Sequence, residues 1–268
     1  MEKMKKILTE MAREQGTELV GVADAARWET IPRSDPEFWP RNIWPWCTRV
    51  VVLGARIFLP MTATTPSALN GEMYNTSNRV LDDTAYRLAV WINRQGYRAF
   101  FFPRDCYGNP KILNTNPCAA FSQALAGYYA GLGTIGYHHM LITPEVGPRL
   151  RLVSVITDMP LEPDPMLETE LCVQCGQCAR KCPSGALKGT DPHDPKLADM
   201  DRICCALYHE NLAGHFCAPC GVCANVCPIG ADLAAFRGTE AVTDAGIDHV
   251  RSYGSRPFTE GEKIGPLP

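Results

Sequence analysis

Two cysteine motifs of identical spacing lie in the second half of the chain. Each has the pattern C-x2-C-x2-C-x3-C and a proline after its fourth cysteine, and CPSGA in the first motif matches CPIGA in the second. The cysteines are Cys172, Cys175, Cys178 and Cys182 in the first motif and Cys217, Cys220, Cys223 and Cys227 in the second. Four soft thiolates at this spacing are typical ligands of a [4Fe-4S] cluster. Zinc ribbons, the alternative, pair two C-x2-C units without the Cys-Pro endings.

In two-cluster ferredoxins the fourth cysteine of each motif binds the other cluster. This rule assigns Cys227 to the first three cysteines of the first motif, and Cys182 to Cys217, Cys220 and Cys223. Two further cysteines, Cys204 and Cys205 in DRICCALYH, have two interpretations. They are buried thiols on a helix, or Cys205 replaces Cys217 as a ligand. Spacing alone favours Cys217.

The composition is that of a globular protein. The chain has 268 residues, 46% hydrophobic and 21% charged, which suffices for one large or two ordinary domains. A net charge of -3 does not indicate a generally basic surface that would bind nucleic acid or an anionic membrane. We find no apolar export segment and no run of 18 apolar residues, and therefore expect a cytoplasmic protein without a membrane span. In that compartment thirteen cysteines indicate metal rather than disulfides.

The first 160 residues mix helical and strand patterns, so we expect an α+β domain there. Three prolines in 159–165 predict a linker, the cysteine domain then covers 166–237, and 238–268 form a tail without a clear period. The expected helices are 4–15, 81–95 and 118–130, the strands are 18–23, 50–54, 98–102, 140–143 and 150–158, and the loops are 28–48, 60–78 and 103–117.

The stretch GLGTIG at 131–136 matches the dinucleotide pattern G-x-G-x-x-G. That fingerprint needs a strand before it and a helix after it, so that the pyrophosphate meets the helix N-terminus. Here a helix precedes the glycines and a strand follows, and Pro144, Gly147 and Pro148 exclude a helix in the next dozen residues. The glycines therefore predict a tight helix-to-strand turn or a close backbone approach to another large ligand.

The order of these segments resembles that of the epoxyqueuosine reductases and the related corrinoid reductive dehalogenases. The resemblance rests on AGLGTIGYHHMLITPEVGPRLRLVSVITD at 130–158, on GTELVGVADAARW and RVVVLG before it, and on LCVQCGQCARKCPSGAL and PCGVCANVCPIG after it. It covers about residues 5 to 232.

This resemblance implies a nitroreductase-like N-terminal domain that binds cobalamin, with two [4Fe-4S] clusters that pass electrons to cobalt. The turn of Gly131, Gly133, Ile135 and Gly136 would approach the corrinoid or shape its pocket, with His138 and His139 beside it. Epoxyqueuosine reductases also take a remote cysteine before the second motif as a ligand, and Cys205 in CALY resembles that position. Cys205 and Cys217 therefore both remain candidates for the same ligand position of the second cluster.

Two departures from the family pattern concern the substrate. The tRNA-acting members carry a helical-repeat extension after the ferredoxin-type module, for which residues 238–268 are too few. Their catalytic Asp, in a D-x-x-P stretch before the AGLG helix, has no counterpart in NTNPCAAFSQALAGYY. We therefore expect a small-molecule or nucleoside substrate rather than nucleic acid, and we take Tyr107 and Asp105 as the candidate proton donors in the loop before that helix.

Three functions are compatible with these features. The first is a corrinoid and iron–sulfur reductase that receives electrons from a low-potential donor such as a ferredoxin or flavodoxin. The second is an electron-transfer protein that serves a partner's corrinoid. The third is a flavin enzyme with FMN in the N-terminal domain. Stoichiometric cobalamin binding distinguishes the first from the other two.

Overall fold

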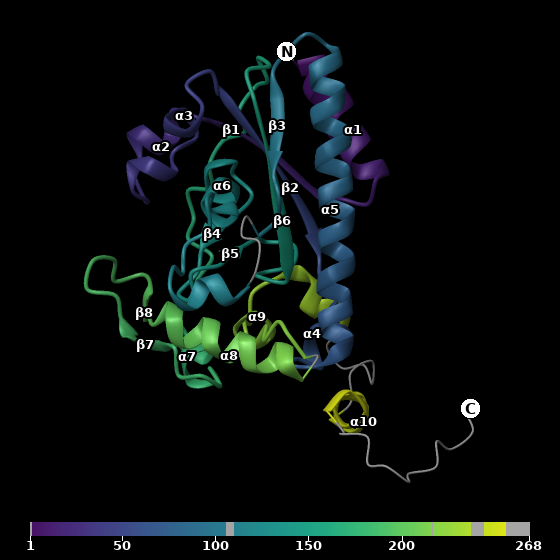
Figure 1. The fold of residues 1–268 in the computed structure, drawn as a ribbon, viewed down its shortest axis with the longest axis vertical. Coiled ribbons are helices and arrows are strands. Elements are labelled where there is room, and N and C mark those ends of the chain that lie inside the picture. The colour runs from purple at the N-terminus through teal and green to yellow at the C-terminus, as the bar shows by residue number, and fades with distance from the viewer. Residues whose placement is uncertain (1, 106–109, 216, 237–243, 256–268) are drawn as a thin grey trace.

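A four-stranded antiparallel sheet forms the centre of the computed structural model, which describes residues 2–105, 110–215, 217–236 and 244–255. The strands are β1 (Leu19–Asp24), β2 (Arg49–Arg56), β3 (Ala99–Phe102) and β6 (Leu150–Thr157), in the order β1-β2-β6-β3. All four agree with the expected strands to within two residues. The mixture of helices and strands is therefore as predicted (Figure 1).

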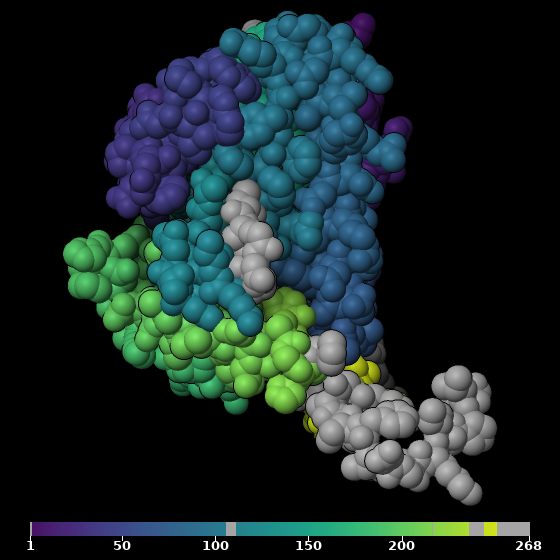
Figure 2. Space-filling view, in the orientation of Figure 1, coloured from purple at the N-terminus to yellow at the C-terminus, as the bar shows by residue number. Residues whose placement is uncertain are grey.

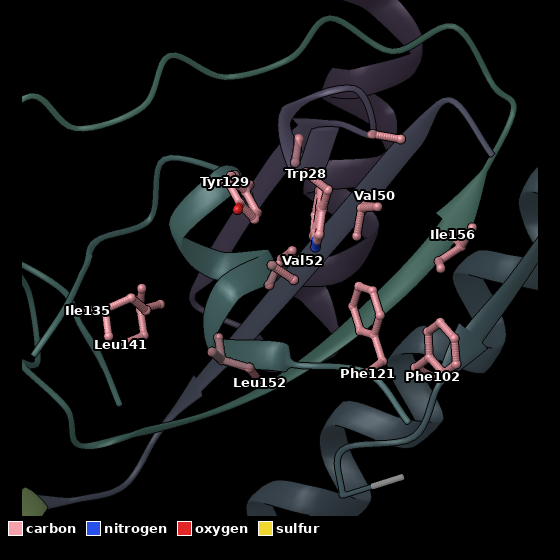
Figure 3. Packing of buried hydrophobic residues seen from close by; sticks show 14 of the residues in the cluster. Trp28, Val50, Val52, Phe102, Phe121, Tyr129, Ile135, Leu141, Leu152 and Ile156 are labelled. Carbon is pink, nitrogen blue, oxygen red and sulfur yellow. The ribbon is translucent and has the colours of Figure 1, made fainter. Parts of the chain in front are cut away.

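The two central strands are buried on both faces because their apolar residues are continuous rather than alternating. Val51 and Leu53 of β2 pack under α1 (Glu2–Glu14) and α5 (Ala68–Arg94), whereas Val50 and Val52 face the opposite core. Figure 3 shows that second core, where Trp28 packs between the sheet and Tyr129 of α6 (Gln123–Tyr129). The sheet thus separates a helical layer from a layer of α6 and irregular chain.

The largest error of the sequence prediction concerns 60–78, which is helix rather than loop. It contains α4 (Leu59–Ala63) and the start of α5, where the Ser67 hydroxyl accepts the Asn70 amide N–H at 3.1 Å as an N-cap. The polar residues here are buried against the cysteine-rich region: the Asn70 side chain donates to the carbonyl of Pro219 at 3.3 Å. Polar composition predicted a loop because this tertiary contact has no local signal.

Four other segments also differ from expectation. Helix α6 begins only at Gln123, where Ser122 caps it, so 118–122 is not helical. The strand expected at 140–143 is the two-residue β5 (Leu141–Ile142), paired with β4 (Thr134–Ile135). The tail contains a helix, α10 (Asp244–Ser255). The loop at 28–48 carries three short helical turns, α2 (Arg27–Thr30), η1 (Pro36–Phe38) and α3 (Pro40–Ile43).

The two cysteine motifs are structural repeats as well as sequence repeats. Gly176 and Gly221 follow the second cysteine of their motifs with φ of +69° and +66°, and each is the N-cap of a one-turn helix. Glycine is favoured there because other residues are strained at such angles. The remaining elements of this region are α7 (Gln177–Arg180), β7 (Leu187–Thr190), β8 (Ala198–Met200), α8 (Arg202–Gly214), α9 (Val222–Asn225) and η3 (Ala231–Phe236).

The proline-rich linker at 159–165 is bound to the sheet. Met159 and Leu161 are buried in the helical-side core. Asp164 pairs with Val22 of β1 through two hydrogen bonds of 2.8 Å and forms an ion pair with Lys5 at 2.6 Å. The linker thereby covers the outer edge of β1 and fixes the direction in which the chain enters the first cysteine motif.

A buried arginine joins the sheet to the second cysteine motif. The Arg149 side chain is 0% exposed and makes a bidentate pair with Asp232 at 2.6 and 2.8 Å. Its guanidinium also donates to the carbonyl oxygens of Cys227 at 3.1 Å and Ile229 at 2.7 Å. Because the guanidinium is bonded on all sides, it sets the position of Cys227 relative to β6.

We predict that Asp232→Asn destabilises the protein by about 3 kcal/mol or more, because it leaves a buried guanidinium without its counter-charge. The thermal-unfolding midpoint of the anaerobically purified protein should fall by several degrees. Glu18→Gln, which breaks the half-exposed pair with Arg56, is the control and should change stability by less than about 1 kcal/mol. Equal effects of the two variants would contradict the role given to Arg149.

Candidate metal centre and adjoining cavity

Four cysteines from both motifs surround one small cavity. Its wall contains Cys172, Cys175, Cys178 and Cys227, together with Tyr137, His138, Ile142 and Ile229. Burial raises the pKa of the Cys178 and Cys227 thiols, and Cys172 and Cys175 raise both further. Among the described residues no three His, Cys, Asp or Glu side chains are close enough to hold a single metal ion, and these four cysteines stand around a space instead.

A second group of cysteines gathers beside the first. Burial, with smaller contributions from Cys220 and Cys182, raises the pKa of Cys205 to about 11. Burial likewise raises the pKa of Cys223, with contributions from Cys220, Cys205 and Cys182. Cys205 is thus close to three motif cysteines, although it lies on α8 outside both motifs. The Cys217 thiol donates to the carbonyl of His215 at 3.2 Å and packs with Leu212 and Cys220.

A cavity of about 1410 Å³ lies between the sheet domain and the cysteine-rich region. Its wall includes Cys205, so the second cysteine group adjoins it. The rest of the wall includes residues 30–33, Tyr74 and Asn75 of α5, the start of α6, the turn between β7 and β8, and further residues of α8. Figure 2 shows the purple segment that includes 30–33 and the green β7–β8 segment on the same side of the molecule.

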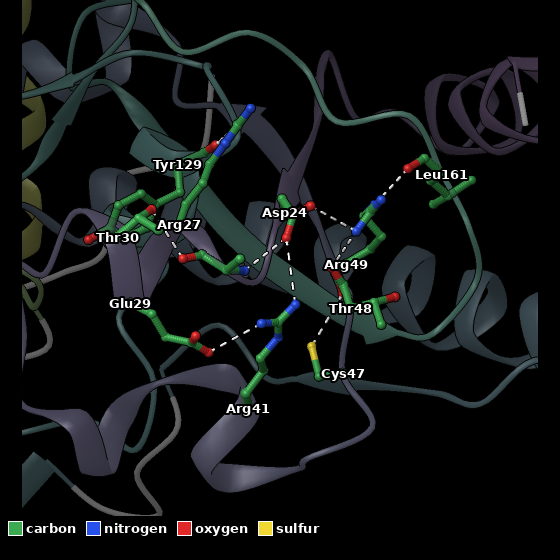
Figure 4. Close-up of polar contacts among 11 residues, drawn as sticks. Asp24, Arg27, Glu29, Thr30, Arg41, Cys47, Thr48, Arg49, Tyr129 and Leu161 are labelled. Atoms are coloured by element: carbon green, nitrogen blue, oxygen red, sulfur yellow. Dashed lines mark hydrogen bonds and ion pairs between the residues drawn. The ribbon is translucent and has the colours of Figure 1, made fainter.

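The irregular segment that supplies residues 30–33 is fixed in place by charge. Asp24, at the end of β1, accepts from the backbone N–H of Ala26 at 2.8 Å and pairs with Arg49 at 3.0 Å and Arg41 at 3.9 Å (Figure 4). The Tyr129 hydroxyl donates to the Ile31 carbonyl at 2.5 Å. The cavity wall at 30–33 is therefore bonded both to the sheet and to α6.

Asp105, a predicted proton donor, lines the cavity within a polar group. It accepts from the Tyr74 hydroxyl at 2.8 Å and from Arg151 at 2.5 Å, and the Arg151 guanidinium lies 4.3 Å from the centre of the Tyr74 ring. Tyr107 lies outside the described residues. Tyr74 was missed by the sequence analysis because its segment was expected to be a loop remote from the site.

The three glycines of GLGTIG pack against protein. A Cβ on Gly131 would lie 2.0 Å from the Pro165 carbonyl oxygen, and one on Gly133 would lie 2.0 Å from that of Ile142. A Cβ on Gly136 would meet Ile142 and His138 within 2.7 Å. These contacts make the stretch a tight turn from α6 into β4, the strand that pairs with β5. Its part in cofactor binding stays a prediction.

The remaining predicted cofactor residues divide between the two cavities. Ile135 and His139 line the large cavity, and a ring nitrogen of His139 lies 2.7 Å from the Ala198 carbonyl of β8. His138 lines the small cavity with the first cysteine group. Burial lowers the pKa of His138 to about 4.

Comparison with known proteins identifies related enzymes. A family of 4Fe-4S binding domains matches residues 165–188. A tetrachloroethene reductive dehalogenase of Dehalobacter restrictus is 34% identical over 137 residues, which are 50% of this chain and 22% of the dehalogenase. An epoxyqueuosine reductase of Synechococcus sp. is 28% identical over 194 residues, 70% of this chain and 52% of the reductase. The chain is related to both kinds of enzyme.

A solved structure of a reductive dehalogenase has a similar fold. A reductive dehalogenase, whose structure suggests a mechanism for B12-dependent dehalogenation, superposes on this chain with a TM-score of 0.62. The superposition covers 92% of this chain and 33% of the dehalogenase chain, at 18% sequence identity. The sequence matches confirm the predicted relationship to epoxyqueuosine reductases and reductive dehalogenases. The matches cover about a fifth to a half of the curated relatives' own length. None of the described helices is long and apolar enough to cross a membrane.

We predict that Gly133→Ala destabilises the protein by about 3 kcal/mol, because its Cβ meets the Ile142 carbonyl in the paired strand. Gly214→Ala is the matched control, since no atom lies within 4 Å of its added Cβ, and it should change stability by less than about 0.5 kcal/mol. Thermal unfolding followed by circular dichroism measures both. A neutral Gly133→Ala would contradict the tight turn.

Proposed function

We propose that this protein is an iron–sulfur reductase that binds cobalamin in the large cavity and reduces a small-molecule or nucleoside substrate there. The observation that carries the proposal is the wall of that cavity: it includes Cys205, which also adjoins Cys182, Cys220 and Cys223. A cofactor in the cavity would therefore lie beside the second cysteine group. A relationship to reductive dehalogenases and epoxyqueuosine reductases supports this reading.

Two [4Fe-4S] clusters are assigned to the two cysteine groups. The first is held by Cys172, Cys175, Cys178 and Cys227. The second is held by Cys182, Cys205, Cys220 and Cys223. For the fourth ligand of this second cluster we choose Cys205 over Cys217, because Cys205 contributes to the charge environment of Cys223 and faces the cavity. Ferredoxin-type spacing supports the other seven.

The residues of the large cavity fit a corrinoid. Its volume exceeds the roughly 300–1,000 Å³ of ordinary ligand pockets, as so large a cofactor requires. The groups that would hold it are Ser122, which caps α6, Leu125 of α6, Ile135, His139 and the segment 30–33. The turn of Gly131, Gly133 and Gly136 would shape the wall. Bound cobalamin would supply the reactive metal for the reduction.

For the proton we propose the group of Tyr74 and Asp105. The Tyr74 hydroxyl donates to a carboxyl oxygen of Asp105 that also accepts from Arg151, so the two groups are within proton-exchange distance of each other. A proton given by Tyr74 to a substrate in the cavity would be replaced from solvent by way of the Asp105 carboxyl group. Tyr107 is kept as a second candidate from the same loop.

In this proposal residues 1–160 form a nitroreductase-like domain and 166–237 a two-cluster ferredoxin-type domain. Electrons would come from a low-potential donor such as a ferredoxin or flavodoxin. The substrate class follows from the relatives: one is named for tetrachloroethene, and an epoxyqueuosine reductase of similar fold was crystallised with an epoxyqueuosine-modified tRNA stem loop. A small molecule or a nucleoside is therefore the class to screen.

The ligand assignment predicts different iron contents for single variants. The native protein, purified anaerobically, should hold about eight irons, as two [4Fe-4S] clusters require. Cys205→Ser should lose most of one cluster, whereas Cys217→Ser and the neighbouring control Cys204→Ser should keep about eight. Iron analysis with electron paramagnetic resonance of the reduced protein measures this. Loss of a cluster in Cys217→Ser alone would contradict the choice of Cys205.

Titration with cob(II)alamin tests the cofactor. One equivalent should change the cobalt resonance signal to the base-off form, and Ala124→Trp, which places a ring in the cavity, should weaken binding about tenfold or more. Ala235→Trp, an exposed control outside the cavity, should bind as the native protein does. If the iron-loaded native protein leaves the cobalamin spectrum unchanged, the protein is an electron carrier rather than a corrinoid enzyme. If it also releases a yellow cofactor on unfolding, it is a flavoprotein.

A further inference from the structure

His138 is a buried histidine that follows the glycine turn. Its side chain lines the small cavity together with Cys172, Cys175, Cys178 and Cys227, and only 4% of the residue is exposed. No step of the proposed reduction uses it, because the wall of the large cavity includes His139 and not His138.

The hydrogen bonds of His138 fix the position of its proton. The backbone N–H of Met140 donates to Nδ1 at 3.2 Å, so Nδ1 acts as the acceptor and Nε2 carries the hydrogen. Nε2 is buried and has no hydrogen-bond partner among the described residues. An unpaired N–H in a buried site is costly, which indicates that a bound group completes the bond.

The chemistry of the cavity identifies that group. Four cysteines already complete the ligand set of a [4Fe-4S] cluster, so the imidazole is not required as a ligand. The sulfide and thiolate sulfurs of the cluster accept hydrogen bonds. The adjacent backbone already donates to such a sulfur, because the N–H of Tyr137 donates to the sulfur of Cys172 at 3.4 Å. Residues 137 and 138 thus form a wall of donors beside the first cysteine group.

We propose that Nε2–H of His138 donates a hydrogen bond to a sulfur of the first cluster and raises its reduction potential. This inference rests on the proposed pair of clusters. One electron enters the cluster on reduction and no bond breaks, so the sulfurs become more negative and the bond strengthens. The donor therefore stabilises the reduced form more than the oxidised form.

The test compares His138→Phe, which removes the donor, with His138→Gln, which keeps an N–H on the side chain. Redox titration of the anaerobic protein, followed by electron paramagnetic resonance, gives the midpoint of each cluster. In His138→Phe, one midpoint should become more negative by the equivalent of about a tenfold change in the reduction equilibrium, or about 59 mV for one electron. His138→Gln should retain most of the native value, and the exposed control His249→Phe should retain all of it.

A direct measurement covers the case in which His138→Phe does not fold. In native protein with 15N-labelled histidine, pulsed resonance of the reduced clusters should detect a weak nitrogen coupling, which disappears in His138→Gln. An unchanged midpoint in an iron-replete His138→Phe, or the absence of that coupling in the native protein, would overturn the inference. A coupling of the strength of a direct iron–nitrogen bond would overturn it as well. Native protein that binds no iron would instead contradict the proposed function.

Discussion

The buried pair of Arg149 and Asp232 links the two halves of this molecule. Arg149 begins at the sheet, just before β6, and its guanidinium ends among the carbonyl oxygens that surround Cys227. A charge in such a place is tolerated only when every donor is satisfied. The distance between the sheet and the second cysteine motif is therefore narrowly set. The large cavity, which lies between these two parts, depends on that distance.

The same motif is held from a second direction by the start of α5. The Asn70 side chain bonds to the Pro219 carbonyl, Thr65 donates to the Cys220 carbonyl, and Gly71 has no side chain where the backbone of Ala218 passes. One continuous helix thus reaches from the sheet core to the cysteine-rich region and also carries Tyr74 to the cavity (Figure 1). Rigid connections of this kind suit a site in which cofactor and electron source must remain close.

Features with local causes could be predicted from the sequence. The β-branched runs of β2 and β6 predicted strands, and the spacing of the motif cysteines predicted an iron–sulfur domain, which a family match now supports. Arg149, Tyr74 and the polar start of α5 could not be predicted in this way, because their roles depend on contacts with residues far along the chain. The role of Cys205 was open for the same reason: spacing favoured Cys217, and only the folding of α8 brings Cys205 beside Cys182 and Cys220. The two histidines after the glycine turn could not be separated from sequence, yet they face different cavities.

The exchange of cysteines between the motifs has a consequence for biogenesis. Cys227 closes the cavity formed by the first motif, and Cys182 of the first motif lies with the second group. A nascent chain that has reached only α8 can close neither group. In the proposed assignment, neither cluster therefore has its full set of ligands until Cys223 and Cys227 have been synthesised.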